Sequence, residues 1–145
     1  LSIYGKSDTE GTCEVKTLAK KLNIDKNVAF YEPVPDIESK YLEASFLLMT
    51  SRFEGFGMVL TEAMACGLPC IAYDCPCGPR AIINEGVNGF LIEDNNAALF
   101  AEKIIQLIED EDLRIRLGEN AKASVEKYNI DVVMQKWNQF FNSLK

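Results

Sequence analysis

The sequence contains no histidine. Ser-His and Cys-His nucleophilic catalysis are therefore excluded for this chain, because both use an imidazole as general base. Its five cysteines are odd in number and none belongs to a C-x-x-C pair, which together with the missing imidazole argues against a zinc site. We expect reduced, partly buried thiols, as in cytoplasmic proteins. The cysteines are Cys13, Cys66, Cys70, Cys75 and Cys77.

Long apolar runs and an excess of positive charge are also missing. No apolar run approaches the roughly 20 residues of a membrane span. The net charge of -7 argues against nucleic acid or an anionic membrane surface as the partner of this chain. A length of 145 residues with 48% hydrophobic residues fits one soluble domain with a sizeable core. We therefore treat residues 1–145 as a single domain.

Short apolar segments alternate with helical patterns along the chain. We expect strands over residues 1–5, 28–31, 46–49, 70–73 and 89–92, and helices over 9–22, 37–44, 57–67 and 79–84. Three longer helices follow: one capped by Asn95 or Asn96, with Leu99, Ile104, Leu107 and Ile108 inward, one over 111–127 and one over 132–144. This order predicts an α/β, Rossmann-like, three-layer parallel sheet with helices on both faces. Ligands of such sheets bind at the carboxyl ends of the strands.

A glycine-rich turn into a helix, between Ser51 and Pro69, carries the clearest chemical signal. Glu54 stands just before this helix, and Glu62 is the only charge between Phe56 and Cys70. Two carboxylates thus flank a helix N-terminus, where free N–H groups and the helix dipole favour an anion. A ligand with phosphate in the middle and hydroxyl groups on each side, such as a nucleotide sugar, fits this arrangement. A purely structural turn, with Glu62 paired to a distant Lys or Arg, fits the residues equally well.

The same stretch resembles the signature of retaining GT-B glycosyltransferases, the large nucleotide-sugar-dependent glycosyltransferase group 1 type. Their pattern, E-G-F-G-x-x-x-x-E-A-M-A-x-G-x-P, is matched from Glu54 to Pro69. The resemblance runs over nearly the whole chain. It implies the carboxy-terminal, donor-binding half of a GT-B fold without its first strand and helix, so we expect a fragment of a longer protein. It also implies that residues 129–145 form a helix crossing to an absent amino-terminal domain, with Trp137 on its apolar face.

The resemblance assigns roles to individual residues. Glu54 corresponds to the catalytic-site carboxylate that contacts the donor hexose, and Glu62 to the residue that accepts hydrogen bonds from both ribose hydroxyls. The backbone between them meets the sugar and the diphosphate, and Val34 lies where the base is held. The donor-binding set is Glu54, Gly55, Phe56, Gly57, Met58, Val59, Glu62 and Val34, with Gly78 and Arg80 as candidate phosphate-side residues.

The chain departs from the family pattern in three ways that affect these roles. Glu32 replaces the usual glycine near the base, and Ala81 stands where many relatives carry glutamate. The chain also begins after an Arg and a Lys that bind the diphosphate in the family. Separately, Arg80 fits a surface position as well as a phosphate contact.

The activity implied is hexose transfer from a nucleotide sugar to a hydroxyl acceptor with retention, in the synthesis of envelope polysaccharide, lipopolysaccharide or glycolipid. No metal or other cofactor is expected. The partners implied are the nucleotide sugar, the absent acceptor-binding domain, and an acceptor sugar, lipid or protein, with no nucleic acid. We expect the parent enzyme to be cytoplasmic or peripheral at the inner membrane face, and this chain alone to be inactive or nearly so.

Three other classes of protein share parts of the predicted fold or of the glycine-rich motif. A non-hydrolysing nucleotide-sugar epimerase has a similar fold but needs a histidine. A flavodoxin-like regulatory module needs an acidic cluster after its first strand, where this chain has Gly5 and Lys6. A dinucleotide-binding loop needs a glycine where Leu60 stands.

Overall fold

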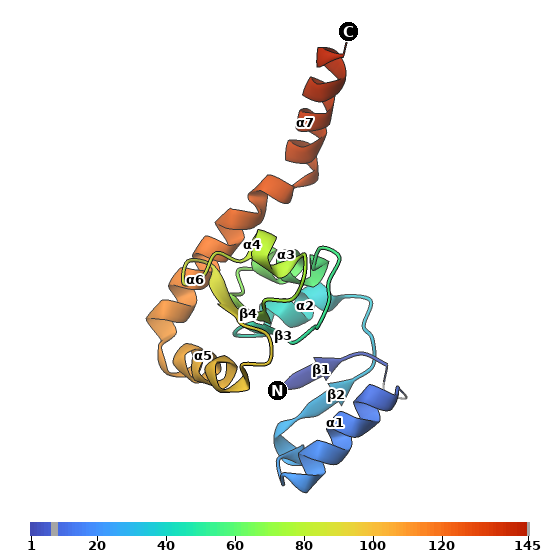
Figure 1. Cartoon of the computed structure of the whole chain (residues 1–145), viewed down its shortest axis with the longest axis vertical. Coiled ribbons are helices and arrows are strands. Elements are labelled where there is room, and N and C mark those ends of the chain that lie inside the picture. Colours follow the sequence, from blue (N-terminus) through green and yellow to red (C-terminus); the bar gives the residue numbers. More distant parts are fainter. Residues whose placement is uncertain (7–8, 145) are drawn as a thin grey trace. The chain divides into compact units, whose positions relative to one another are not determined.

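The computed structural model describes residues 1–6 and 9–144. The chain divides into two compact units, Leu1–Ile37 and Glu38–Lys145. Figure 1 labels the α-helices of the chain and the strands β1 to β4.

The first unit is a strand–helix–strand element. Strands β1 (Ser2–Tyr4) and β2 (Ala29–Tyr31) pair in parallel, with Ile3 opposite Phe30. Helix α1 (Glu10–Lys21) and the short 3-10 helix η1 (Asp25–Asn27) connect them. α1 begins where expected, because the Thr9 side chain accepts a hydrogen bond from the Thr12 N–H at 3.3 Å and so caps the helix.

The second unit is built on a sheet of three parallel strands in the order β3-β4-β5. The strands are β3 (Leu47–Met49), β4 (Cys70–Tyr73) and β5 (Gly89–Ile92). Leu48, Ile71 and Phe90 lie side by side across it. The predicted parallel α/β organisation is confirmed. In the described residues the strands form two hydrogen-bonded sheets, one in each unit, where the sequence analysis expected one.

Among the described residues, seven helical segments precede, connect or follow these three strands. They are α2 (Ile37–Leu42), α3 (Met58–Ala65), α4 (Pro79–Ile82), α5 (Ala97–Glu109), α6 (Glu111–Val125), the 3-10 helix η2 (Glu126–Tyr128) and α7 (Ile130–Ser143). Side-chain caps fix the start of three of them: Asn96 accepts from the Leu99 N–H, Asp110 accepts from the Leu113 N–H at 2.8 Å, and Asn129 accepts from the Asp131 N–H at 2.9 Å. Of the two capping residues expected for α5, Asn96 is the one observed.

The side chains of β4 alternate between the two faces of this sheet, as the pleat requires. The Cys70 thiol points to the Leu60 carbonyl of α3. Ile71 belongs to a buried cluster with Phe100 and Leu107 of α5, and the Tyr73 ring stacks 4.7 Å from that of Phe100. Helices α3 and α5 therefore cover opposite faces, which is the predicted three-layer arrangement.

One inward prediction for α5 is wrong. Ile108 is 61% exposed, while Phe100 is 6% exposed and takes a central place in the core. Ile108 lies about 100° around the helix from Leu107, on the side that it shares with the exposed Ile105. Leu107 is fully buried and holds the inward position.

Helices α3 and α6 meet through backbone contact. A side chain at Gly118 of α6 would overlap the carbonyl of Gly67, just beyond the end of α3. Only glycine permits this close approach, so α6 is held tightly beside the helix that follows the glycine-rich turn.

Helix α7 has no buried residue. Its Trp137 ring packs on those of Phe140 and Phe141, at 6.1 and 5.6 Å between centroids, and all three remain about half exposed. Within the described residues, no helix combines the length and the apolar character that crossing a bilayer requires.

Candidate functional site

The turn into α3 has the form that the sequence predicts. Gly57 is the N-cap of α3, is buried and has a φ of 85°. In the described part of the chain no side chain caps this helix, so the N–H groups of Met58 and Val59 stay available to a ligand, whereas the Leu60 N–H donates to the Gly57 carbonyl at 2.9 Å. The helix ends at Ala65, two residues before the predicted Gly67.

Gly78 brings a second loop against this turn. A Cβ atom at Gly78 would lie 2.6 Å from the Phe56 carbonyl oxygen and 3.1 Å from the Glu54 Cβ. Any side chain would therefore push the two loops apart. The loops that follow β3 and β4 thus meet, and the structure brings together Glu54, Phe56, Gly57 and Gly78 as one site.

Tyr128, in η2, supports both loops. Its ring makes an edge-on contact with Phe56 at 5.3 Å between centroids. Its hydroxyl donates to the Ala81 carbonyl of α4 at 3.2 Å. The sequence analysis did not identify Tyr128, because 72 residues separate it from Phe56 and no local pattern links them.

Glu62 lies on the exposed side of α3. The Tyr41 hydroxyl of α2 donates to its Oε2 at 3.4 Å. Burial, followed by the charge of Glu62, raises the pKa of Tyr41 to about 12. In the described residues no Lys or Arg forms an ion pair with Glu62, so the structural salt bridge considered for this residue is absent there.

Arg80 is paired with Asp74 across the β4–α4 loop. The Arg80 Nε donates to Asp74 Oδ1 at 3.0 Å and its Nη2 donates to Oδ2. Accepting these bonds, Asp74 raises the pKa of Arg80. The Arg80 side chain is 76% exposed. The phosphate-side role considered for Arg80 therefore has to compete with an internal carboxylate.

The remaining predicted residues lie in two places. Gly55, Met58 and Val59 belong to the turn and first turn of α3, where Met58 is 66% exposed. Val34 is partly buried in the segment between β2 and α2, within the first unit. Because Val34 and the turn into α3 lie in different units, the contact between Val34 and the base stays a prediction.

The described residues of the second unit line several hollows, and two of them bear on the site. One, of about 360 Å³, runs beside α3 and is lined by Thr61, Glu62 and Ala65 together with Lys122, Val125, Glu126, Tyr128 and Asn129. The other, of about 540 Å³, lies at the turn between α5 and α6 and is lined by Gln106, Glu109, Asp110, Glu111 and Asp112.

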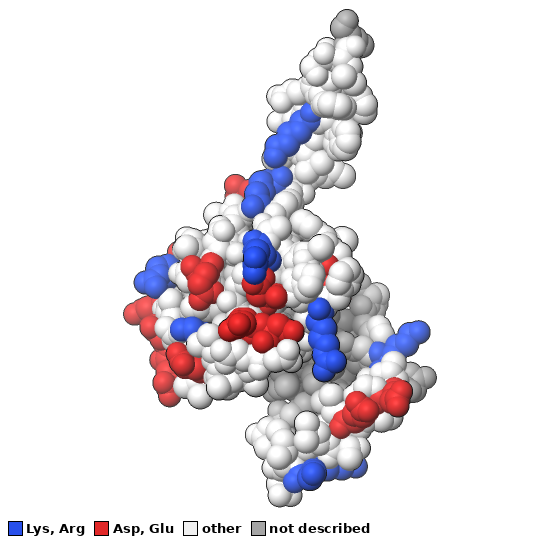
Figure 2. Space-filling model, viewed as in Figure 1, with Lys and Arg blue, Asp and Glu red and all other residues white. Residues whose placement is uncertain are grey.

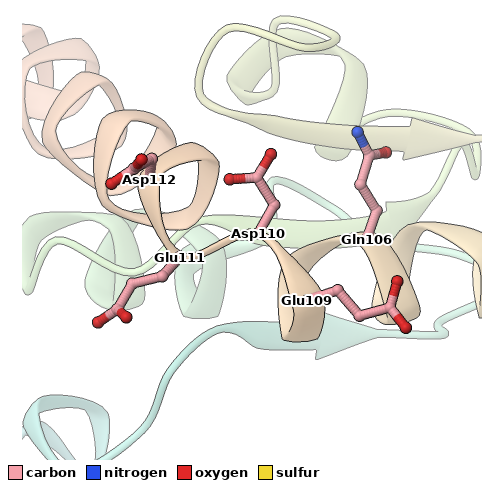
Figure 3. A pocket seen from close by; sticks show the side chains of 5 residues that line it. All are labelled: Gln106, Glu109, Asp110, Glu111 and Asp112. Atoms are coloured by element: carbon pink, nitrogen blue, oxygen red, sulfur yellow. The ribbon is translucent and has the colours of Figure 1, made fainter.

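The second hollow is not suited to a phosphate or a metal. Its carboxylates would repel an anion. Figure 3 shows the side chains of Glu109 and Glu111 pointing to different sides of the turn, so they do not converge on one point. Among the described residues, no group of three or more acidic, cysteine or histidine side chains is placed to hold a metal ion.

Comparison with known proteins identifies the family of this chain. The family model described as glycosyl transferases group 1 matches residues 1–124. The chain is 33% identical to the amylovoran biosynthesis glycosyltransferase AmsD of Erwinia amylovora, over 93% of this chain and 38% of that protein. It is 33% identical to a poly(ribitol-phosphate) alpha-N-acetylglucosaminyltransferase of Staphylococcus aureus, over 97% of this chain and 28% of that protein. The chain thus spans about a third of the length of these relatives.

Solved structures with the same fold include those of TarM and HepE. The crystal structure of TarM superposes with a TM-score of 0.86 at 29% identity, covering 97% of this chain and 28% of TarM. The structure of HepE from Anabaena in complex with UDP gives a TM-score of 0.85 at 28% identity, covering 98% of this chain and 40% of HepE. With the fold, the motif from Glu54 to Pro69 and the family model in agreement, this chain belongs to the glycosyl transferases group 1 family.

Proposed function

We propose that this chain is the donor-binding half of an enzyme that transfers a hexose from a nucleotide sugar to a hydroxyl acceptor, with retention of configuration. The observation that carries this proposal is the packing of Gly78 against the Glu54–Gly57 turn. The loop that carries Glu54 packs on Gly78 just before the uncapped N-terminus of an eight-residue helix, and such an N-terminus favours an anion. The diphosphate would lie against these N–H groups, between the hexose at Glu54 and the ribose at Glu62.

The chemistry proposed for the protein is electrostatic. As the bond between hexose and diphosphate breaks, negative charge grows on the phosphate oxygens, and fixed N–H donors stabilise it. The carboxylate of Glu54 holds the hexose hydroxyls, and Glu62 offers two oxygens to the vicinal ribose diol. We propose that neither a metal nor another cofactor takes part.

The relatives support a role in building cell-envelope polysaccharides or related glycans. AmsD acts in amylovoran biosynthesis, and HepE has been solved with UDP and with UDP-glucose. We propose a nucleotide sugar as donor on this basis, with a sugar, lipid or protein acceptor. The acceptor would be held by an amino-terminal domain, toward which α7 would cross, so this chain alone should transfer little or no sugar.

The test is a calorimetric titration of the chain with UDP, GDP and ADP. One nucleotide should bind, and Glu62→Ala should weaken its binding about ten-fold or more, because a hydrogen bond to a charged group is worth about 1.5–3 kcal/mol. Glu109→Ala is the matched control, since it removes the same charge at the end of α5, in a hollow that Glu62 does not line. Binding that is unaffected by Glu62→Ala would contradict the proposed role of Glu62.

A further inference from the structure

We propose that Tyr41 is a positioning residue that holds the Glu62 carboxylate ready for the ribose hydroxyls of the donor nucleotide. The inference rests on the proposed function, because it concerns how Glu62 is presented to that ligand. Tyr41 belongs to α2 and Glu62 to α3, and both lie in the second unit.

In this pair the hydrogen-bond donor, Tyr41, is buried and the acceptor, Glu62, is exposed. Tyr41 is 7% exposed, so its ring is held by the surrounding core, whereas Glu62 is exposed at the surface of α3. The hydroxyl lies 3.4 Å from Glu62 Oε2, beyond the usual O–H···O distance of about 2.5–3.0 Å, so the hydrogen bond is weak until the exposed carboxylate moves closer. Of all the described side chains, Tyr41 is the one that donates a hydrogen bond to Glu62.

The remaining acceptor capacity of Glu62 matches a vicinal diol. An ionised carboxylate has about four lone-pair sites on its two oxygens. Tyr41 uses one site on Oε2, which leaves Oε1 free and one site on Oε2 open. Two adjacent hydroxyls can therefore donate to Glu62 while the Tyr41 bond is kept.

An exposed glutamate without such a partner would sample several rotamers and would lose that freedom when it binds. Anchoring one oxygen before the ligand arrives lowers this entropic cost, which is the general effect of preorganisation. Burial, followed by the charge of Glu62, raises the pKa of Tyr41 to about 12, so the hydroxyl is protonated and remains a donor at neutral pH. A merely structural tyrosine would affect stability without affecting recognition of the ribose.

The experiment measures ribose selectivity. The chain is titrated with whichever of UDP, GDP and ADP it binds most tightly, and then with the 2′-deoxy form of that nucleotide. The unsubstituted chain should bind the ribonucleotide about ten-fold more tightly, since one hydrogen bond to a carboxylate is lost in the deoxy form. Tyr41→Phe should reduce this ratio to about three or less, with most of the loss in affinity for the ribonucleotide.

Two further variants complete the comparison. Glu62→Gln should abolish the selectivity, whereas Tyr73→Phe should preserve it, because that ring packs on Phe100 at the other face of the sheet. Each ratio compares two ligands on one protein sample, so partial unfolding of a variant lowers both affinities equally and cancels.

The outcomes separate the inference from the proposed function. A ratio unchanged in Tyr41→Phe but lost in Glu62→Gln would overturn the role of Tyr41 and leave Glu62 as the ribose ligand. A ratio unchanged in both would overturn the assignment of Glu62 as well. Absence of binding by all three nucleotides would overturn the proposed function of this chain and the inference with it.

Discussion

Tyr41 also makes the stability of the second unit depend on alkaline pH. Its hydroxyl faces Glu62, Cys66 and Cys70, and its pKa rises to about 12 in the folded chain from about 10 when unfolded. Below pH of about 10 the hydroxyl is protonated in both states, and its contribution to stability is fully present. As the pH rises toward about 12 the unfolded chain loses this proton first, so stability falls.

We expect this loss to amount to about 1–2 kcal/mol in the free energy of unfolding. Urea denaturation of the chain and of Tyr41→Phe, between pH of about 9 and 11.5, measures it. The substitution should make the decline shallower, because the other tyrosines and thiols titrate in both proteins. Parallel pH profiles for the two proteins would show that the Tyr41 pKa is not shifted by folding.

The positions of the candidate site residues could be predicted where the chain keeps them close together, whereas their roles stay predictions. Glu54 and Glu62 stand within one loop and the helix that follows it, so the sequence alone placed them on either side of the N-terminus of α3. The partners of these residues could not be predicted, because Tyr41 and Tyr128 reach the site only through folding. The pairing of Arg80 with Asp74 was missed for a related reason, since a six-residue loop separation carries no periodic signal.

At the scale of elements, the contact between α3 and α6 should be intolerant of any side chain at Gly118. Replacement by alanine would raise the helix propensity of α6 by about 1 kcal/mol. The new Cβ would nevertheless collide with the Gly67 carbonyl, a backbone atom that cannot rotate away. We therefore expect Gly118→Ala to destabilise the chain by about 2 kcal/mol or more.

Chemical denaturation with urea checks this expectation. Gly11→Ala is the matched control, since Gly11 lies in α1 and a Cβ there would meet nothing within 4 Å. That substitution should be neutral or stabilising by about 0.5–1 kcal/mol. A midpoint for Gly118→Ala that equals or exceeds the unsubstituted value would mean that α6 can move away from Gly67 at no cost.

The order and type of the elements followed from the sequence, because turn residues separate nearly every apolar segment. Cys70–Tyr73 and Gly89–Ile92 were placed with their observed bounds. Burial of helix faces was less predictable. On α1 the apolar residues Val15 and Leu18 have helical spacing, yet both are about half exposed. Spacing reveals which residues share a face, but not what covers it.

At the scale of the whole molecule, α7 should make the isolated chain associate with itself. Its fourteen residues include only two charged side chains, Asp131 and Lys136, and Figure 2 shows the corresponding segment as largely uncharged. The exposed aromatic cluster of Trp137, Phe140 and Phe141 forms an apolar surface, and such surfaces drive association.

Sedimentation velocity over a range of protein concentrations tests this expectation. The unsubstituted chain should form dimers or larger species at micromolar to millimolar concentration, and Phe140→Lys should shift it toward monomer. The fluorescence of Trp137, the single tryptophan, should move to shorter wavelength as association buries it. A chain that stays monomeric throughout would show that the aromatic cluster on α7 does not associate at these concentrations.

The pairing of Arg80 with Asp74 has a consequence for the effect of salt. Because the pair has no net charge, attraction for a diphosphate at this loop would come mainly from the N–H dipoles of α3, which act over a short range. The chain as a whole carries a net charge of -7, so it repels a nucleotide at long range. Nucleotide affinity should therefore change little, or rise slightly, as ionic strength increases from about 0.01 to 0.15 M. A steep fall in affinity over that interval would instead indicate an unpaired cation at the phosphates.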